Sequence, residues 1–302
     1  ARPEISDWEY DEMLRELQAL EERFPDLAAD DSPTRRVGGE PLEAFETVEH
    51  AVPMLSISNI TNRHDLVNFD RQIRKQVEGG VSYVVEPKID GVAVSLRYEG
   101  GVLAVGSTRG DGRRGDDITA NLKTVRVIPH RLHTVSPPAV FEVRGEVFMP
   151  REAFAALNAR LDEAGQPVFA NPRNATAGTL KQLDPKIVAG RPLAAVLYGV
   201  GEVAGLEIGT HEDLLAVLSD VGLPIPPVAR RGEDLEAVMA AVDELQTRRH
   251  DFPFDIDGAV IKVNERSLYE RLKATERHVG WAKAFKYPPE QAETRLREIS
   301  IQ

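Results

Sequence analysis

Short stretches of alternating apolar and polar residues recur along the chain and predict a core rich in β-strands. The first β-rich run covers residues 81–85, and at 92–98 large apolar residues alternate with smaller or polar ones. Glu99, Gly100 and Gly101 give a turn signal before the apolar pattern returns at 102–105, which is typical of a hairpin. We expect further strands at 141–149, 193–200, 256–263 and 281–288.

Other stretches repeat apolar residues every three or four positions, the spacing of amphipathic helices. Residues 66–76 show it most clearly. Near the start, Ser6 and Glu9 match a capping box, and a helix is expected from there to the residue before Pro25. We expect further helices at 151–164, 211–221, 233–249 and about 265–274, a short one through Leu122 capped by Asp117, and a polar loop at 171–178.

Charged residues stand beside several of these apolar strands, where packing alone does not require them. Lys88 lies in the expected loop after the first run, with Glu86 two positions before it and Asp90 and Gly91 after it. Lys-x-Asp-Gly is short, and chance would produce it in roughly one such sequence in twenty, so it needs context.

The context comes from later strands. The strand at 141–149 places Glu142, Arg144 and Glu146 on one face. Two more apolar strands carry Lys262 and Lys286 at their ends, in a chain with only 9 lysines against 28 arginines. Several charged groups at strand ends therefore favour a functional site over simple solvation.

Taken in order, these motifs resemble the nucleotidyltransferase motifs of DNA ligases and messenger-RNA capping enzymes. The fuller strings are similar to one branch, the NAD-dependent DNA ligases of bacteria, from about residue 6 to the C-terminus. The strings are Glu-Pro-Lys-Ile-Asp-Gly (86–91), Thr-Arg-Gly-Asp-Gly (108–112), Arg-Gly-Glu-Val-Phe (144–148), Asn-Pro-Arg-Asn-Ala-Thr-Ala-Gly (171–178) and Asp-Gly-Ala-Val-Ile-Lys (257–262). The resemblance implies an α+β fold: an ATP-grasp-like ligase adenylation domain of antiparallel sheets with flanking helices over 51–302, after a small helical cap over 1–50.

The resemblance also implies the chemistry. Lys88 would attack the α-phosphorus of NAD, release nicotinamide mononucleotide and carry AMP to the 5′-phosphate of a DNA nick in replication and repair. The amine must be neutral to attack, and burial or nearby positive charge would favour that form. The resemblance implies that the nicotinamide mononucleotide half of NAD is held by Asp7, Trp8, Glu9, Tyr10 and Asp11. Adenosine would contact Ser56 and Ile57. Phosphate or DNA would contact Arg173 and Lys181.

Charge and position suggest the remaining roles. Glu86 lies on the same side of its strand as Lys88 and could accept from the adenine amino group, whereas Glu146, with Arg109 beside it, suits ribose hydroxyls. Lys262 and Lys286 would stabilise charge on the α-phosphate. Asp90 would orient the Lys88 amine and Gly91 would complete the turn. Asp257 could hold Mg²⁺ or Mn²⁺, although a strand-end salt bridge is an equal alternative.

Composition limits the partners. The net charge is −12, but residues 1–50 hold fifteen acidic residues against five arginines, so the remainder is nearly balanced. A dedicated nucleic-acid surface is therefore not expected, and nicked DNA would be bound mainly by further C-terminal domains, where family members also carry zinc.

The chain has no cysteine, which excludes disulfides and thiolate metal sites and suits a reducing bacterial cytoplasm. No apolar run reaches twenty residues, and we expect a monomer without a membrane span.

Two alternatives remain at this point. An ATP- or GTP-using ligase or capping enzyme shares the lysine motif but has no need of the Asp-Trp-Glu-Tyr-Asp string at 7–11. A catalytically idle nucleotide-binding module would share the fold without forming a covalent intermediate. The presence of all three motif lysines argues against that second alternative.

Overall fold

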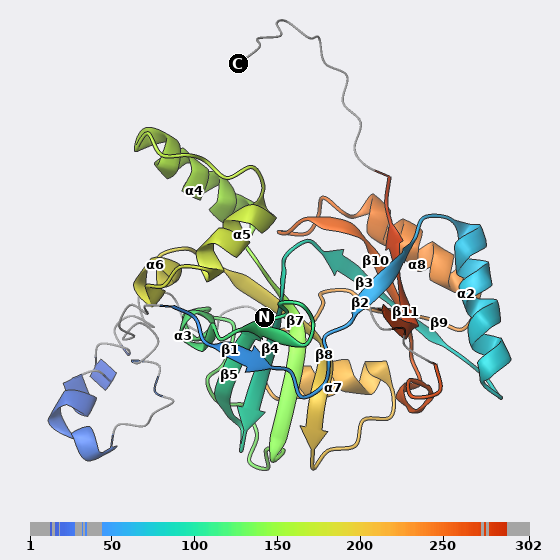
Figure 1. The fold of residues 1–302 in the computed structure, drawn as a ribbon, viewed down its shortest axis with the longest axis horizontal. Helices are drawn as coiled ribbons and strands as arrows, with labels where there is room; N and C mark the ends of the chain where they lie inside the picture. Colours follow the sequence, from blue (N-terminus) through green and yellow to red (C-terminus); the bar gives the residue numbers. More distant parts are fainter. Residues whose placement is uncertain are drawn as a thin grey trace, which may run out of the picture.

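The computed structural model describes residues 44–272, 275 and 278–288, together with residues 13, 16, 17, 19–27, 32 and 34 of the N-terminal stretch. Its main elements are two β-sheets joined by the turn between strands β3 and β4, with helices packed against both sheets (Figure 1). Among the described residues, no helix combines the length and apolar character that a bilayer span requires.

The first sheet has five strands in the order β2-β11-β10-β3-β9. Its central strand β10 runs antiparallel to both neighbours, β11 and β3. At the edges, β2 pairs parallel with β11, and β9 pairs antiparallel with β3. The strands are β2 (Ser56–Ile60), β3 (Tyr83–Ile89), β9 (Arg230–Gly232), β10 (Ile256–Val263) and β11 (His278–Lys286).

The second sheet has four strands in the order β5-β4-β7-β8, all paired antiparallel. Along β4, Val94, Leu96 and Tyr98 are fully buried, as the alternating pattern predicts. A separate two-stranded ribbon ties the segment before the first sheet to the loop after β5. The strands are β4 (Val92–Glu99), β5 (Val102–Thr108), β7 (Val140–Phe148) and β8 (Ala194–Ala204), with β1 (Thr47–Glu49) and β6 (Arg114–Asp116) in the ribbon.

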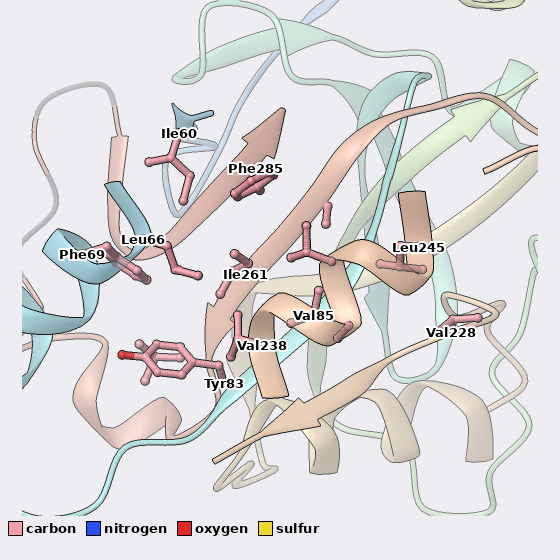
Figure 2. Packing of buried hydrophobic residues seen from close by; sticks show 14 of the residues in the cluster. Ile60, Leu66, Phe69, Tyr83, Val85, Val228, Val238, Leu245, Ile261 and Phe285 are labelled. Carbon is pink, nitrogen blue, oxygen red and sulfur yellow. The ribbon is translucent and has the colours of Figure 1, made fainter. Parts of the chain in front are cut away.

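Helices α2 (Arg63–Gln76) and α8 (Leu235–Thr247) cover the first sheet and build its core (Figure 2). From α2, Leu66 and Phe69 pack in one cluster with Tyr83 of β3 and Ile261 of β10. Full burial of such side chains contributes roughly 1.5–3 kcal/mol each relative to exposure. This core fixes the positions of the strands that carry the charged motif residues.

Helix α7 (His211–Asp220) packs its leucines into the core of the second sheet. A capping box starts it: Thr210 accepts from the backbone N–H of Asp213, and the Asp213 carboxylate accepts from that of Thr210. Other helices of the described part of the chain are α3 (Thr119–Lys123), α4 (Arg151–Glu163), α5 (Pro172–Leu180) and α6 (Pro185–Ala189), with 3₁₀ turns at η1 (Pro25–Leu27) and η3 (Arg266–Leu268).

Most predicted elements are confirmed, including the helices at 66–76, 151–164, 211–221 and 233–249 and the strands at 141–149 and 256–263. Lys88 differs, because it lies within β3 opposite Gly258 of β10 and not in a loop. The loop predicted at 171–178 is also wrong. Asn171 accepts from the N–H of Asn174, and Pro172 occupies the first turn, so these residues start helix α5.

The helix predicted at about 265–274 is wrong as well, since the described part of that range holds only the 3₁₀ turn η3. Tertiary contacts override the local pattern there: the Tyr269 ring stacks on Trp281 with centroids 4.1 Å apart, and its hydroxyl donates to the carbonyl of Val263. Asp117 does cap the short helix α3, but from one residue before the N-cap, by accepting from the N–H of Thr119.

Candidate active site

Lys88, Asp257 and Lys286 meet at one end of the first sheet. Gly258 lies opposite Lys88 on β3 and opposite Lys286 on β11, so the three adjacent strands bring these side chains together. The Nζ atom of Lys88 is 3.1 Å from Oδ1 and 3.4 Å from Oδ2 of Asp257, and Lys286 donates to the same Oδ2. Burial alone would raise the pKa of Asp257, but the two lysines hold it below its ordinary value.

Two motif glycines permit this close packing of strands. A Cβ on Gly91 would lie 2.4 Å from the carbonyl oxygen of Val147, where β4 approaches β7. A Cβ on Gly258 would lie 2.1 Å from the carbonyl oxygen of Phe285, on the strand that carries Lys286. These two Asp-Gly pairs therefore place a carboxylate next to a backbone that only glycine can approach so closely.

A second cluster is almost fully buried beneath the first sheet. Lys262 donates to Oε2 of Glu86 at 2.6 Å and to the carbonyl of Tyr198 at 3.0 Å. His211 lies on the other carboxylate oxygen, with Nε2 2.5 Å from Oε1 of Glu86. Burial opposes ionisation of Glu86, but Lys262 and His211 together lower its pKa to about 2. The cluster therefore contains a carboxylate that stays ionised without solvent.

Glu146 lies on β7 of the second sheet and has one oxygen without a partner. Its Oε1 accepts from the hydroxyl of Tyr198 at 3.1 Å, whereas Oε2 is buried and has no hydrogen bond. Burial raises the pKa of Glu146 to about 7, against the opposing effects of Tyr198, Lys88 and Arg173. A buried acceptor of this kind suits a ligand hydroxyl.

The other predicted residues occupy several positions around these clusters. Arg109 follows β5 and its Nη1 lies 3.4 Å from the Ser56 hydroxyl of β2, so two expected adenosine contacts are neighbours. Ile57 is half-buried on the same strand, and Lys181 is the exposed C-cap residue of α5. Asp7, Trp8, Glu9, Tyr10 and Asp11 lie outside the described residues.

Two expected roles differ from the geometry. Asp90 does not contact the Lys88 amine, because its Oδ1 accepts from Arg173 of α5 at 2.6 Å, and Asp257 takes the place beside the amine. Lys262 is not beside Lys286, because it is bound to Glu86. On β10, Lys262 lies four residues from Gly258, the register partner of Lys286, so the two lysines are separated along the strands.

Two residues of these clusters, His211 and Tyr198, are not predicted by the sequence pattern. A lone histidine at the start of a helix gives no sequence pattern that would indicate a functional role. Tyr198 lies within the strand expected at 193–200, where nothing sets it apart from a core tyrosine. It is two residues from Val196, the register partner of Glu146, so its contact with Glu146 follows only once the strand pairing is known.

Comparison with known proteins identifies the family. Residues 42–290 match the model of the NAD-dependent DNA ligase adenylation domain, and residues 1–38 match the DNA ligase-like, N-terminal NAD+-binding domain. The chain belongs to the NAD-dependent DNA ligase family. It therefore contains an adenylation domain and an NAD+-binding domain, which confirms the resemblance of the motifs.

Bacterial relatives support this assignment to the ligase family. The chain is 51% identical over 300 residues to the DNA ligase of Desulforudis audaxviator and 48% identical over 302 residues to that of Geobacter sulfurreducens, covering 99% of this chain and 45% of each relative. This ligase chain thus spans less than half the length of these relatives. Among solved structures, the ATP complex of the bacteriophage T7 ATP-dependent DNA ligase aligns with a TM-score of 0.38 and 14% sequence identity. The alignment covers 76% of this chain and 67% of the T7 ligase chain.

Proposed function

We propose that this chain transfers AMP from NAD to the side-chain nitrogen of Lys88 and releases nicotinamide mononucleotide. The observation that carries the proposal is the single carboxylate of Asp257, held between the amines of Lys88 and Lys286. A structural salt bridge needs only one lysine. Two amines about one carboxylate, in a domain of the adenylating family, suit a nucleophile with a second cation for the phosphate.

In the proposed step, neutral Nζ of Lys88 attacks the α-phosphorus. A nitrogen–phosphorus bond forms, the bond from phosphorus to the bridging oxygen breaks, and nicotinamide mononucleotide leaves with that oxygen. Asp257, which contacts Nζ, is positioned to take the proton that the nitrogen loses and pass it to water. Lys286 offers positive charge to the phosphate oxygens in the transition state.

The adenosine half has complementary groups in the two sheets. We assign the adenine amino group to Glu86, whose carboxylate stays ionised between Lys262 and His211. We assign a ribose hydroxyl to the unpartnered Oε2 of Glu146, with Arg109 beside Ser56 at the edge of the same region. The position of Lys262 supports a role near the base and not at the α-phosphate.

Magnesium is proposed to enter with NAD. Among the described residues, no group of three His, Cys, Asp or Glu side chains forms a candidate metal centre. Asp257 alone is already neutralised by two lysines, but Mg²⁺ commonly binds one carboxylate together with substrate phosphates and water. Asp257 and the phosphates of NAD would hold the ion, which would neutralise phosphate charge.

The remaining assignments extend to the whole enzyme. Residues 7–11 lie within the matched NAD+-binding domain, and we propose that they hold the nicotinamide mononucleotide half. We propose residues 1–50 as the cap and 51–302 as the catalytic part, with β1 pairing to the latter through β6. The proposed final substrate is nicked DNA in the bacterial cytoplasm, contacted through Arg173 and Lys181 and through further domains, with the chain acting as a monomer.

The test is intact-mass spectrometry after incubation with NAD and magnesium, beside an ATP control. The expected result is one added AMP from NAD only, mapped to Lys88 by peptide analysis. Lys88→Ala and Lys88→Arg should both remove it, since a guanidinium does not lose its proton at working pH. AMP on another residue would contradict the mechanism, and an adduct from ATP alone would favour the ATP-using alternative.

A further inference from the structure

Helix α7 brings a histidine from outside the first sheet into contact with the buried pair of Glu86 and Lys262. His211 is 2% exposed, and its Nε2 lies 2.5 Å from Oε1 of Glu86 and 3.3 Å from Nζ of Lys262. Burial lowers the pKa of His211, and the Lys262 ammonium lowers it further, against the opposing effect of Glu86. An ionised carboxylate can only accept, so the Nε2–H of His211 donates to Glu86, and the carboxylate has one donor on each oxygen.

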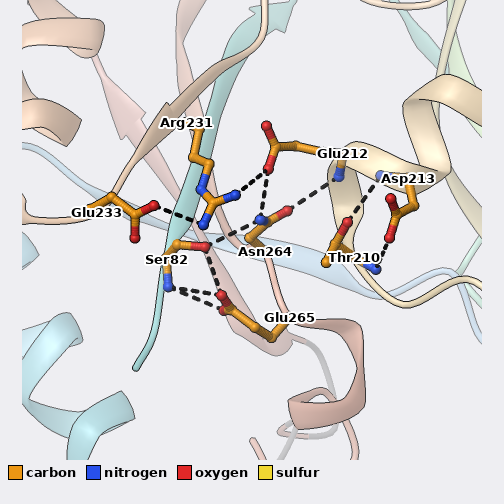
Figure 3. Close-up of polar contacts among 8 residues, drawn as sticks. All are labelled: Ser82, Thr210, Glu212, Asp213, Arg231, Glu233, Asn264 and Glu265. Atoms are coloured by element: carbon orange, nitrogen blue, oxygen red, sulfur yellow. Dashed lines mark hydrogen bonds and ion pairs between the residues drawn. The ribbon is translucent and has the colours of Figure 1, made fainter. Parts of the chain in front are cut away.

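A hydrogen-bonded cluster around Asn264 fixes this end of α7 (Figure 3). The backbone carbonyl of Asn264 accepts from the N–H of His211 at 2.7 Å, and its Oδ1 accepts from the N–H of Glu212 at 3.2 Å. Its Nδ2 donates to the hydroxyl of Ser82 at 3.2 Å. Ser82 directly precedes β3 and Asn264 directly follows β10, so the helix start is tied to the two strands that carry the buried pair.

We propose that His211 is a positioning residue for recognition of the adenine ring, acting through Glu86. The proposal rests on the proposed contact between Glu86 and the base. Two fixed donors leave the carboxylate with free lone pairs in set directions, which suits an exocyclic amino group. Hypoxanthine has a carbonyl at the same ring position. Both that carbonyl and the carboxylate are acceptors, so no hydrogen bond can form between them. His211 thereby makes the site selective for 6-amino over 6-oxo purines.

The test compares NAD with nicotinamide hypoxanthine dinucleotide in single-turnover adenylation of the 302-residue chain. His211→Ala should raise KM for NAD and lower the preference for NAD over the hypoxanthine dinucleotide about tenfold. That is the effect expected from losing one buried hydrogen bond to a charged group. The rate at saturating NAD should stay within about threefold of the parent. His211→Gln, whose amide nitrogen can replace the Nε2 donor, should restore most of the preference.

The matched control is His130→Ala, because His130 is also buried but its Nε2 lies 2.9 Å from the carbonyl oxygen of Lys123. This variant should keep the parent preference whatever its stability. If His211→Ala does not fold, His211→Met and His211→Gln replace it, being similar in size and differing in the donor. A lower preference in the Met variant supports the proposal, and equal preferences overturn it.

Failure of this inference is separable from failure of the proposed function. If the parent forms the Lys88 adduct and His211→Ala discriminates as well as the parent, only the role of His211 is wrong. If the parent forms no adduct, the proposed function fails. Equilibrium binding of AMP and IMP then tests His211 without chemistry: a loss confined to AMP supports the role, and equal or absent losses contradict it.

Discussion

The ammonium of Lys262 lies 2.6 Å from Oε2 of Glu86, and neither side chain exposes more than 3% of its surface. Removing one partner from such a pair leaves an uncompensated charge in the interior. Lys262→Met should therefore lower the free energy of unfolding by about 3–5 kcal/mol, measured by urea denaturation. The double variant Lys262→Met with Glu86→Gln should recover a substantial part of the lost free energy of unfolding.

The exposed pair of Arg173 and Asp90 provides the comparison for this measurement. Both side chains are at least a third exposed, and pairs of that kind are worth roughly 0–1 kcal/mol. Arg173→Met should change the free energy of unfolding by less than about 1 kcal/mol. Equal losses in the two methionine variants would contradict the role assigned to burial.

Asp257→Asn should slow adenylation strongly. The change removes the charge that holds Lys88 and Lys286 together and the proposed acceptor for the lysine proton, and we expect a loss of roughly a hundredfold or more. Rapid-quench measurement of the adduct gives the rate. Asp255→Asn is the control, since Asp255 pairs with Arg151 on α4, and a parent-like rate in both variants would remove Asp257 from the mechanism.

Glu146 should make stability depend on pH. Its pKa in the folded chain is about 7, above the ordinary 4.5, because it is buried. The folded state therefore holds this proton more tightly, and its stabilising contribution is complete below about pH 4.5 and is lost as pH rises through 7. The lost contribution is on the order of 3 kcal/mol. Between about pH 5 and 8, urea denaturation should show a smaller fall in the free energy of unfolding for Glu146→Gln than for the parent. Identical pH dependence of the two free energies would contradict this.

Tyr10→Ala and Asp11→Ala should slow adduct formation from NAD while leaving AMP binding near the parent value. These side chains are proposed to touch only the leaving half of NAD, so the loss concerns that half alone. Rates come from the appearance of the adduct and AMP affinity from calorimetry. If both variants react with NAD as fast as the parent, the N-terminal segment does not hold nicotinamide mononucleotide.

The sequence pattern predicted the strands and the identity of the charged motif residues, because both depend on local alternation and short strings. It did not predict their pairing. Which carboxylate contacts Lys88 depends on the register of β3 against β10, and the contact joins Lys88 to Asp257, 169 positions further along the chain. His211 and Tyr198 were missed for the same reason, since each acts through a partner on another element.

The register also determines when the proposed active site can assemble during synthesis. β10 lies between β3 and β11 in space, yet it is translated long after β3. Until β10 and β11 have left the ribosome, Lys88 has neither its carboxylate nor its companion lysine, and Glu86 has no counter-ion. If the proposed function holds, a nascent chain that ends before β10 would carry Lys88 but could not be charged with AMP.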